Sequence, residues 1–373
     1  MKIALVSTGL GRVVRGFEAF TDSLFRSLRR FAPHVDVTLF QGGGTTGDGR
    51  VEVPNFHRQD VPARWLGYEK GNLLEKRSFA LAIYPLLRKD GFDIVHYNEL
   101  VMGSALFHLR RLFGGKYKLL YCNGAPSPPI HYHHRCDFAQ VLTGPAYAEA
   151  REFGISENRL FLLPYGVDGD LFNSRNRAKR QQVRGDISIP ENAIVVLTVA
   201  ALNKWHKRID YLIKEISHLD DSVWLLAAGQ RTDETNALER EAYRYLPGRC
   251  HFLTWPHEKI HVLYGAADIF VLGSLTEGFG IVTVEAMLSG LPIILHRNDV
   301  NGWITDGAPV QLVDMSVEGE LAKALSNLLS NGTSGRSRDF AKKRFSWEEL
   351  VPQYVRMYAK LLEASSNQMN YGQ

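Results

Sequence analysis

The sequence contains few cysteines, no long apolar run and only a small excess of positive charge. Its three cysteines, Cys122, Cys136 and Cys250, have no metal-ligand spacing and leave one thiol unpaired in any disulfide scheme, which favours a reduced, cytoplasmic setting. No window holds the roughly 18 consecutive apolar residues that a membrane span needs. The apolar run in "MKIALVSTGLG" is short for a signal peptide and is more typical of a first β-strand.

The net charge is only +4 at pH 7, which is too small to indicate a nucleic-acid partner. Basic residues nevertheless cluster at 26–31, 108–118 and 175–184. Such clusters are usually solvated helix faces. The alternative is contact with an anionic lipid or an anionic acceptor, which leaves peripheral membrane association through the N-terminal half open.

With 45% hydrophobic and 23% charged residues in 373, the chain is typical of a globular protein large enough for two domains. Short apolar runs alternate with segments of helical periodicity, in two series that a polar, basic stretch at 173–188 separates. The expected strands are 2–8, 35–40, 93–98, 118–123, 139–144, 160–166, 193–201, 223–229, 251–255 and 268–274. This alternation predicts an α/β protein with two Rossmann-like, doubly wound domains and a linker near 172–190.

We therefore expect an N-terminal domain over 1–175 and a C-terminal domain over 190–345. A last helix is predicted over 346–364, although no strand follows it. Its apolar stripe consists of Trp347, Leu350, Tyr354, Tyr358 and Leu361. Ligands of such folds bind in a central cleft at the carboxyl ends of the strands.

The stretch "SLTEGFGIVTVEAMLSGLPIIL", residues 274–295, carries two glutamates that burial does not explain. Glu277 lies in a glycine-punctuated turn after a strand, and Glu285 lies about one turn inside the helix that follows. Gly278 and Gly280 allow close approach of the backbone to a ligand. The two carboxylates can bracket one ligand and accept hydrogen bonds from its hydroxyl groups.

The start of this helix is a second reason to expect a ligand. The N–H groups of Phe279, Gly280 and Ile281 lack intrahelical acceptors there and form an anion site. A phosphate at a helix end with carboxylates on either side fits a nucleotide sugar. Two glutamates eight residues apart are common on helices, but their position after a strand and before "GLPII" is far more specific.

The pattern E-G-F-G-x-x-x-x-E-A-M-x-x-G-x-P resembles the retaining GT-B glycosyltransferases of the large family that includes sucrose-phosphate synthases and mannosyltransferases (glycosyltransferases group 1, family 4-like). Three further segments resemble this family: the linker motif "LPYGVDGDLF", the phosphate-binding "LTVAALNKWHKRIDYLI" and the last helix "FSWEELVPQY". The resemblance is strong over 155–300 and weaker before it. It implies a GT-B fold whose last helix crosses back to the first domain.

The resemblance also implies roles for single residues. Glu277 would contact the transferred sugar, Glu285 the ribose, and Lys207 the diphosphate, where it would stabilise the leaving charge. Other residues would bind the donor through the backbone or near the base: Gly278, Phe279, Gly280, Ile281, Leu253, Thr254 and Trp255. Gly9 and Gly11 would let the first loop approach donor or acceptor, although a plain strand-to-helix turn explains these glycines equally well.

The chain departs from the family pattern at two positions. Many members carry Arg six residues before the lysine, where this chain has Ala201, and Arg208, Lys204 or Asn203 could replace that group. Many members carry His before Gly after the strand at 118–123, where this chain has Asn123. Asn cannot take a proton, but it can donate and accept hydrogen bonds. The retaining mechanism implied by the family needs no protein base if a donor phosphate oxygen deprotonates the acceptor.

Other polar residues invite weaker interpretations. His131, His133 and His134 with Cys136 match no zinc spacing and are better explained as an ordinary loop. The "DGD" at 168–170 is better explained as a turn than as a metal site. His96, Glu99 and His296 lie at predicted strand ends and are candidates for acceptor contact.

We thus expect a metal-independent retaining hexosyltransferase that uses a UDP- or GDP-linked sugar and needs no cofactor. The acceptor would be a glycan, a lipid-linked sugar or a small molecule. Three alternatives share this architecture: a nucleotide-sugar epimerase, a phosphorylase, and a non-catalytic nucleotide-sugar-binding protein. The sequence does not distinguish them.

Overall fold

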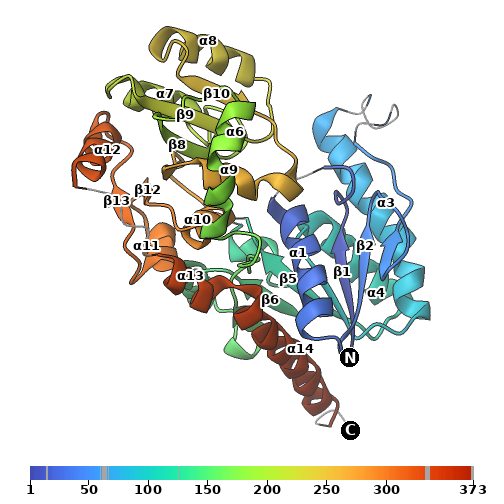
Figure 1. The fold of residues 1–373 in the computed structure, drawn as a ribbon. Helices are drawn as coiled ribbons and strands as arrows, with labels where there is room; N and C mark the ends of the chain where they lie inside the picture. The colour runs from blue at the N-terminus through green and yellow to red at the C-terminus, as the bar shows by residue number, and fades with distance from the viewer. Residues whose placement is uncertain are drawn as a thin grey trace. The chain divides into compact units, whose positions relative to one another are not determined.

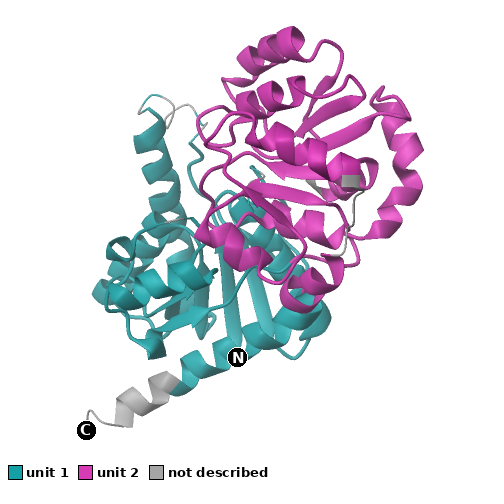
Figure 2. Ribbon diagram, turned by 90° about the vertical axis from the view of Figure 1, so that its left-hand side faces the viewer, with its two compact units in different colours: residues 1–166, 347–373 teal, residues 167–346 magenta. Residues whose placement is uncertain are grey.

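The computed structural model describes residues 1–13, 16–58, 60, 65, 67–125, 127–331 and 337–370 of the chain (Figure 1). The chain divides into two compact units (Figure 2). Unit 1 comprises Met1–Gly166 and the C-terminal segment from Trp347, and unit 2 comprises Val167–Ser346. Within the described ranges, no helix is both long and apolar enough to cross a bilayer.

Unit 1 is built on a seven-stranded, fully parallel sheet with the order β3-β2-β1-β4-β5-β6-β7. Its strands are β1 (Lys2–Ser7), β2 (Asp36–Gln41), β3 (Arg50–Glu52), β4 (Ile94–Tyr97), β5 (Lys118–Asn123), β6 (Phe138–Val141) and β7 (Leu160–Leu162). Its helical elements are α1 (Gly16–Phe31), α3 (Tyr68–Lys89), α4 (Leu100–Phe113), η1 (Pro129–His131), α5 (Gly144–Glu152), η2 (Glu157–Arg159) and α14 (Trp347–Asn370). The central strands are buried on both faces, which is why their sequences are continuously apolar.

The long helix α3 is one element that the alternation of apolar runs does not reveal. It contains Pro85, and its buried face includes Phe79, Ile83 and Leu87 among polar neighbours. It packs along α4, and the two helices cover the same face of the sheet. The sequence pattern also does not predict the short strand β3 on the edge of the sheet.

The last helix, α14, lies against α1 within unit 1. All five residues of its predicted apolar stripe are buried. Trp347 Nε1 donates to Ser23 Oγ at 2.6 Å, and the Tyr354 hydroxyl bonds to the side chain of Gln140 at 2.8 Å. The helix thereby supplies part of the unit 1 core.

Unit 2 has a six-stranded, fully parallel sheet with the order β10-β9-β8-β11-β12-β13. Its strands are β8 (Ile194–Val199), β9 (Val223–Ala228), β10 (Cys250–Leu253), β11 (Ile269–Leu272), β12 (Ile293–His296) and β13 (Gln311–Val313). Its helical elements are η3 (Ser174–Lys179), α6 (Arg180–Asp186), α7 (Ile209–Ser217), α8 (Thr235–Tyr245), η4 (His257–Lys259), α9 (His261–Ala266), α10 (Ile281–Leu288), α11 (Asp299–Thr305), α12 (Glu320–Asn331) and α13 (Arg338–Phe345). The two parallel, doubly wound sheets confirm the predicted fold class.

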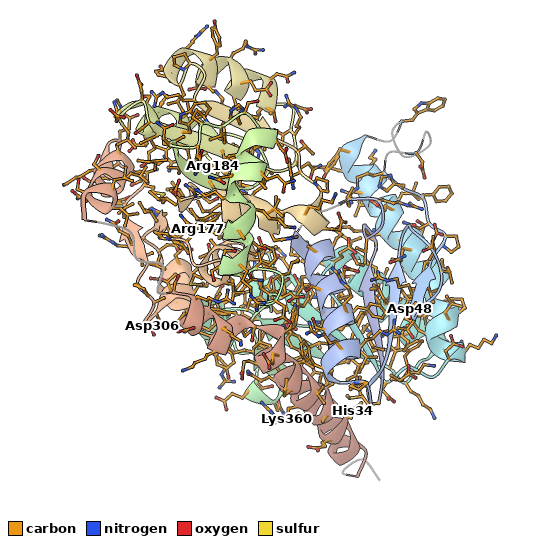
Figure 3. All side chains as sticks on the ribbon, viewed as in Figure 1. His34, Asp48, Arg177, Arg184, Asp306 and Lys360 are labelled. Atoms are coloured by element: carbon orange, nitrogen blue, oxygen red, sulfur yellow. The ribbon has the colours of Figure 1, made fainter. Side chains whose placement is uncertain are left out.

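The stretch that we expected to be a linker is helical and docked on unit 2. It forms η3 and α6, and Arg184 is almost completely buried (Figure 3). Arg177, Arg180 and Arg184 converge on the carboxylate of Asp268. Three arginines of the stretch that suggested a solvated linker therefore share one carboxylate about 90 positions away in sequence, which the local pattern cannot show.

Candidate active site

The strand order of unit 2 places a topological switch point at the carboxyl end of its sheet. β8 and β11 are neighbours, and the chain leads from them toward opposite edges of the sheet. Ligands of doubly wound sheets bind at this switch point. Two loops meet there, residues 200–208 after β8 and residues 273–280 after β11.

Asn203 organises the loop after β8. Its side chain is buried, and its Oδ1 accepts the N–H groups of His206 at 3.3 Å and Lys207 at 2.8 Å. Its carbonyl oxygen accepts the N–H of Ile209, the first residue of α7. These bonds hold the backbone at Lys207 in the loop, two residues before α7 begins at Ile209.

Lys207 and Glu277 form the central ion pair at this switch point. Lys207 Nζ lies 2.5 Å from Glu277 Oε1, and the two side chains are 17% and 9% exposed. His206 completes the contact, because its Nε2 lies 3.2 Å from the Thr276 carbonyl and 3.9 Å from Glu277. The structure therefore brings together two residues that are 70 positions apart in sequence.

The predicted anion site is the beginning of α10. Gly280 caps this helix with φ +67°, a left-handed conformation that disfavours other residues, and α10 begins at Ile281. Within the described chain, neither the Gly280 nor the Ile281 N–H has a hydrogen-bond acceptor. The Phe279 ring is buried edge-on against Phe345, so its side chain belongs to the core. Gly278 completes the turn between Glu277 and the buried Phe279.

Glu285 is buried within α10. The hydroxyl of Tyr264 donates to its Oε2 at 2.6 Å. Burial raises the pKa of the Glu285 carboxyl to about 7, against the lowering effect of this hydrogen bond. A carboxyl that titrates near neutrality can donate or accept a hydrogen bond toward a ligand hydroxyl.

Two further cations of the same loop differ in what they contact. Lys204 Nζ pairs with Glu241 of α8 at 2.6 Å. Arg208 forms no ion pair among the described residues, and its Nη1 donates to the carbonyls of Met315 at 2.7 Å and Gly273 at 3.4 Å. Its backbone is left-handed, with φ +50°, a conformation that costs a non-glycine residue about 1–2 kcal/mol.

The three residues expected near the base lie at the end of the edge strand β10. The carbonyl of Leu253 accepts the Gly229 N–H at 2.8 Å, and Thr254 Oγ1 donates to the Gly229 carbonyl at 3.3 Å. Trp255 Nε1 donates to the carbonyl of Lys259 at 3.1 Å. They share the carboxyl edge of the sheet with the central ion pair.

The remaining predicted site residues belong to unit 1. Asn123 ends β5, and its Nδ2 donates to the Ser127 carbonyl at 3.0 Å, so its side chain braces the following loop. Gly9 accepts the Arg12 N–H within the loop after β1. Gly11 has φ +84°, and a Cβ there would meet the Gly43 carbonyl at 2.1 Å. Loop packing therefore suffices to explain the glycine at position 11.

Glu99 lies at the carboxyl end of β4, next to the same loop. Its carboxylate accepts the Thr8 N–H at 2.9 Å and the Thr8 hydroxyl at 2.6 Å, and it lies 3.5 Å from Lys76 Nζ. His96, our other candidate at this strand end, is instead buried within unit 1, with Nδ1 2.9 Å from the Tyr358 hydroxyl of α14. Burial lowers the pKa of His96 to about 3. The prediction that His96 contacts the acceptor is therefore wrong, because its side chain is enclosed in the core of unit 1.

His296 and the remaining acidic and histidine clusters have local structural explanations. His296 Nδ1 accepts the Met315 N–H at 3.1 Å. Asp168 Oδ1 accepts the N–H groups of Asp170 and Leu171, which makes "DGD" a turn. No group of three or more metal-ligating side chains gathers in the part of the chain that the structure describes.

Asn203, His206 and Tyr264 contact the central residues, although no sequence pattern predicts a role for them there. The sequence pattern makes Asn203 only a candidate replacement for the missing arginine. Its position in the loop between β8 and α7 is a usable signal, since Asn side chains often hydrogen-bond the backbone of turns. Tyr264 had no local signal, because its partner Glu285 is 21 positions away.

Comparison with known proteins gives consistent matches. A sequence model described as "Glycosyl transferases group 1" matches residues 193–331. The D-inositol 3-phosphate glycosyltransferase of Corynebacterium urealyticum is 32% identical over 84% of this chain and 82% of that protein. The protein with the same description from Xylanimonas cellulosilytica is 26% identical over 56% of this chain, and the match covers only 53% of that relative.

Two solved structures share the fold. Sucrose-phosphate synthase from Thermosynechococcus elongatus superposes with a TM-score of 0.79 at 21% identity, over 97% of this chain and 99% of that one. Anabaena HepE in complex with UDP-glucose superposes with a TM-score of 0.73 at 16% identity, over 98% and 100% of the two chains. At these identities the likeness establishes the architecture alone.

Proposed function

Because the chain belongs to the family of group 1 glycosyl transferases, with a GT-B fold, we propose that it is a retaining glycosyltransferase whose donor is a nucleoside-diphosphate sugar. The transferred group would be a hexose and the acceptor group a hydroxyl. The observation that carries this proposal is the Lys207–Glu277 pair at the switch point of the unit 2 sheet, beside the beginning of α10.

Lys207 would act on the diphosphate. The bond from the sugar to the diphosphate breaks with negative charge developing on the leaving oxygen, and a positioned ammonium stabilises that charge. Asn203 fixes the backbone of Lys207 before α7 begins, so the ammonium is held in place before reaction. A preorganised cation costs no reorganisation at the transition state.

Glu277 would hold the sugar. Its carboxylate is nearly buried and oriented by Lys207, which keeps acceptor lone pairs available for sugar hydroxyl groups. The N–H groups at Gly280 and Ile281 would bind phosphate oxygens, where the α10 dipole supplies about half a positive charge. Glu285, with its Tyr264 partner, would contact the ribose hydroxyls.

The balance of charge calls for a second cation. Lys207 is paired with Glu277, so this pair alone does not neutralise a diphosphate of about two negative charges. Lys204 is paired with Glu241 on α8. Arg208 has no ion-pair partner among the described residues; it contacts two neutral carbonyls and the Tyr211 ring, whose centroid is 4.2 Å away, and it occupies a strained backbone conformation that glycine would adopt freely. We therefore assign the role left vacant at Ala201 to Arg208.

The relatives and neighbours support the substrate classes. HepE was solved with UDP-glucose, which fits a nucleotide-sugar donor, while D-inositol 3-phosphate glycosyltransferases suggest a small polyol phosphate as one acceptor to test. The proposal includes no metal and no cofactor, because Lys207, Arg208 and the α10 N–H groups supply the positive charge. A cytoplasmic location fits this donor class and the unpaired cysteines.

A two-part experiment tests the proposal. Thermal melts with a panel of UDP-, GDP- and ADP-linked sugars should identify the donor, because a ligand bound only by the folded state raises Tm by mass action. With that donor and an acceptor panel, NMR of the product should show the anomeric configuration of the donor. An inverted product would disprove the retaining mechanism. Conversion of the donor without acceptor would indicate an epimerase, and a requirement for phosphate would indicate a phosphorylase.

A further inference from the structure

The three basic clusters of the sequence have different environments in the structure. In cluster 26–31, Arg26 pairs with Asp22 at 2.6 Å and Arg29 with Asp48 at 2.7 Å. In cluster 175–184, three arginines share Asp268. The fold itself therefore explains much of the positive charge in these two clusters.

Cluster 108–118 is different. Arg110 pairs with Asp137 at 2.5 Å and belongs to the fold. The six residues that follow, Arg111–Lys116 with the sequence RLFGGK, are all exposed where α4 ends. Neither Arg111 nor Lys116 forms an ion pair with any described residue. Between them, Leu112 is 74% exposed and Phe113 is 60% exposed.

The end of α3 extends this surface. Its last turn carries Arg88 and Lys89, both exposed and both without an ion pair among the described residues. The Arg88 guanidinium lies 5.9 Å from the Tyr84 ring, and that ring lies 6.3 Å from the Phe113 ring. The Tyr84 hydroxyl also donates to the Gly114 carbonyl at 2.5 Å, so the two helix ends form one surface.

We call this surface the α3–α4 tip; it consists of Arg88, Lys89, Arg111, Leu112, Phe113 and Lys116. Its nearest acidic residue in sequence is Asp90, which caps α3. Basic residues at helix ends are common because they complement the helix dipole. The dipole does not explain two adjacent large apolar side chains in water between four unpaired cations, and an exposed apolar group with a polar rim marks an interaction site.

We propose that the α3–α4 tip docks on an anionic lipid surface. Leu112 and Phe113 enter the interface between headgroups and acyl chains, while Arg88, Lys89, Arg111 and Lys116 contact lipid phosphates. The two glycines at 114 and 115 leave the tip without bulky side chains beside Phe113. This contact anchors unit 1 peripherally, in agreement with the lack of a membrane-crossing helix among those described. The proposal is independent of which sugar or acceptor the enzyme uses.

The arrangement favours lipid over a soluble polyanion. Each cation near an anionic bilayer contributes roughly a fivefold gain in binding, so four cations together give on the order of several hundredfold. A soluble polyanion would also attract the cations, but it would gain nothing from Leu112 and Phe113. The apolar pair therefore distinguishes the two classes of partner.

The experiment is flotation of the full-length protein with vesicles of phosphatidylcholine alone or mixed equally with phosphatidylglycerol. We expect binding to the mixed vesicles only, weakened by high salt. Arg111→Glu/Lys116→Glu should lose at least about 25-fold in binding, since two cations of about fivefold each are removed. Leu112→Ser/Phe113→Ser keeps every charge and should still lose on the order of tenfold or more.

Lys342→Glu/Lys343→Glu is the matched control, because it makes the same change in net charge at exposed lysines of α13 in unit 2. It should bind nearly as the wild type does. Unchanged melting curves and turnover of a soluble acceptor would show that the variants fold. Equal binding to both vesicle types, a control as weak as the tip variants, or full binding by Leu112→Ser/Phe113→Ser would overturn the proposal. Tip-dependent binding of heparin without vesicle binding would instead indicate a soluble polyanion.

Discussion

The two units carry similar ion pairs at equivalent places in their sheets, but the contacts of these pairs differ. In each unit, a glutamate after the fourth strand reaches toward the loop after the first strand: Glu99 in unit 1 and Glu277 in unit 2. The two carboxylates are 7% and 9% exposed, and each lies near a lysine that is 17% exposed, Lys76 and Lys207. The doubly wound topology thus produces the same local arrangement twice.

The difference lies in the other partners of the carboxylate. Glu99 also accepts the N–H and the hydroxyl of Thr8, so its lone pairs are used by the fold. Glu277 is held in the described structure by side chains, Lys207 at 2.5 Å and His206 at 3.9 Å. A carboxylate bound to backbone fixes a loop, whereas one bound to side chains can exchange partners for a ligand. The sheet topology therefore places a glutamate at the same point in both units, and its other hydrogen-bond partners decide whether it can bind a ligand.

The largest expected effect separates these two glutamates. Glu277→Ala should lower turnover by roughly 10²–10³, the scale of one lost preorganised polar contact, while nucleoside diphosphate still binds. Glu99→Ala should instead lower the free energy of unfolding by about 1–3 kcal/mol, because the Thr8 N–H loses its acceptor. Steady-state kinetics and denaturant melts check both variants. Near-normal turnover of a folded Glu277→Ala variant would show that Glu277 has no role in catalysis. The proposed functional difference between Glu277 and Glu99 would then be wrong.

The next effect concerns cations within unit 2. Arg208→Ala should raise the dissociation constant for nucleoside diphosphate by roughly 10–100-fold, the worth of one charge-assisted contact. Lys204→Ala, a matched loss of charge in the same loop, should change it less than threefold, because Lys204 serves Glu241. Calorimetric titration measures both. A silent Arg208→Ala with a severe Lys204→Ala would assign the second cation to Lys204.

Glu285 offers a smaller, kinetic distinction. If it contacts the ribose equally in ground and transition states, Glu285→Gln should raise the donor KM by about tenfold and change kcat little. The wild-type donor KM should vary with pH around 7, where this carboxyl titrates. The Gln variant should lose that part of the pH profile. A fall in kcat at constant KM would mean that the roles of the two glutamates are exchanged.

A last pair of effects compares how buried groups of the two units respond to acid. The pKa of His96 in unit 1 is lowered to about 3, so the unfolded chain binds its proton first as pH falls below about 6.5, and the folded state loses stability. The pKa of Glu285 in unit 2 is raised to about 7, so the folded state binds its proton first and gains stability as pH falls from 7 toward about 4.5.

Between pH 7 and pH 5, each group should therefore contribute about 2 kcal/mol, with opposite signs. Denaturant melts of His96→Gln, Glu285→Gln and the wild type across this pH range measure the contribution of each group to the free energy of unfolding. We expect the His96 variant to become relatively more stable in acid and the Glu285 variant relatively less stable. Parallel pH profiles for all three proteins would show that burial does not perturb these groups.

The sequence predicted much of the fold because its signals are local. Continuous apolar runs identified the buried parallel strands, and the stripe of five residues identified the packed face of α14. The failures have a common cause. The basic stretch 173–188 looked solvated because its partner Asp268 is distant in sequence. Helix α3 was not predicted because its apolar residues do not recur with a regular helical spacing.

The sequence by itself determined the two doubly wound units, the glycine turn with Glu277 and the helix that carries Glu285, since each depends on neighbours along the chain. Only the tertiary structure decided that Lys207 meets Glu277, that Glu285 meets Tyr264, and that His96 lies in the core. It also decided which basic clusters find acidic partners. Ion pairing and burial act through space, so they depend on residues that the folded sheets bring together from distant parts of the chain.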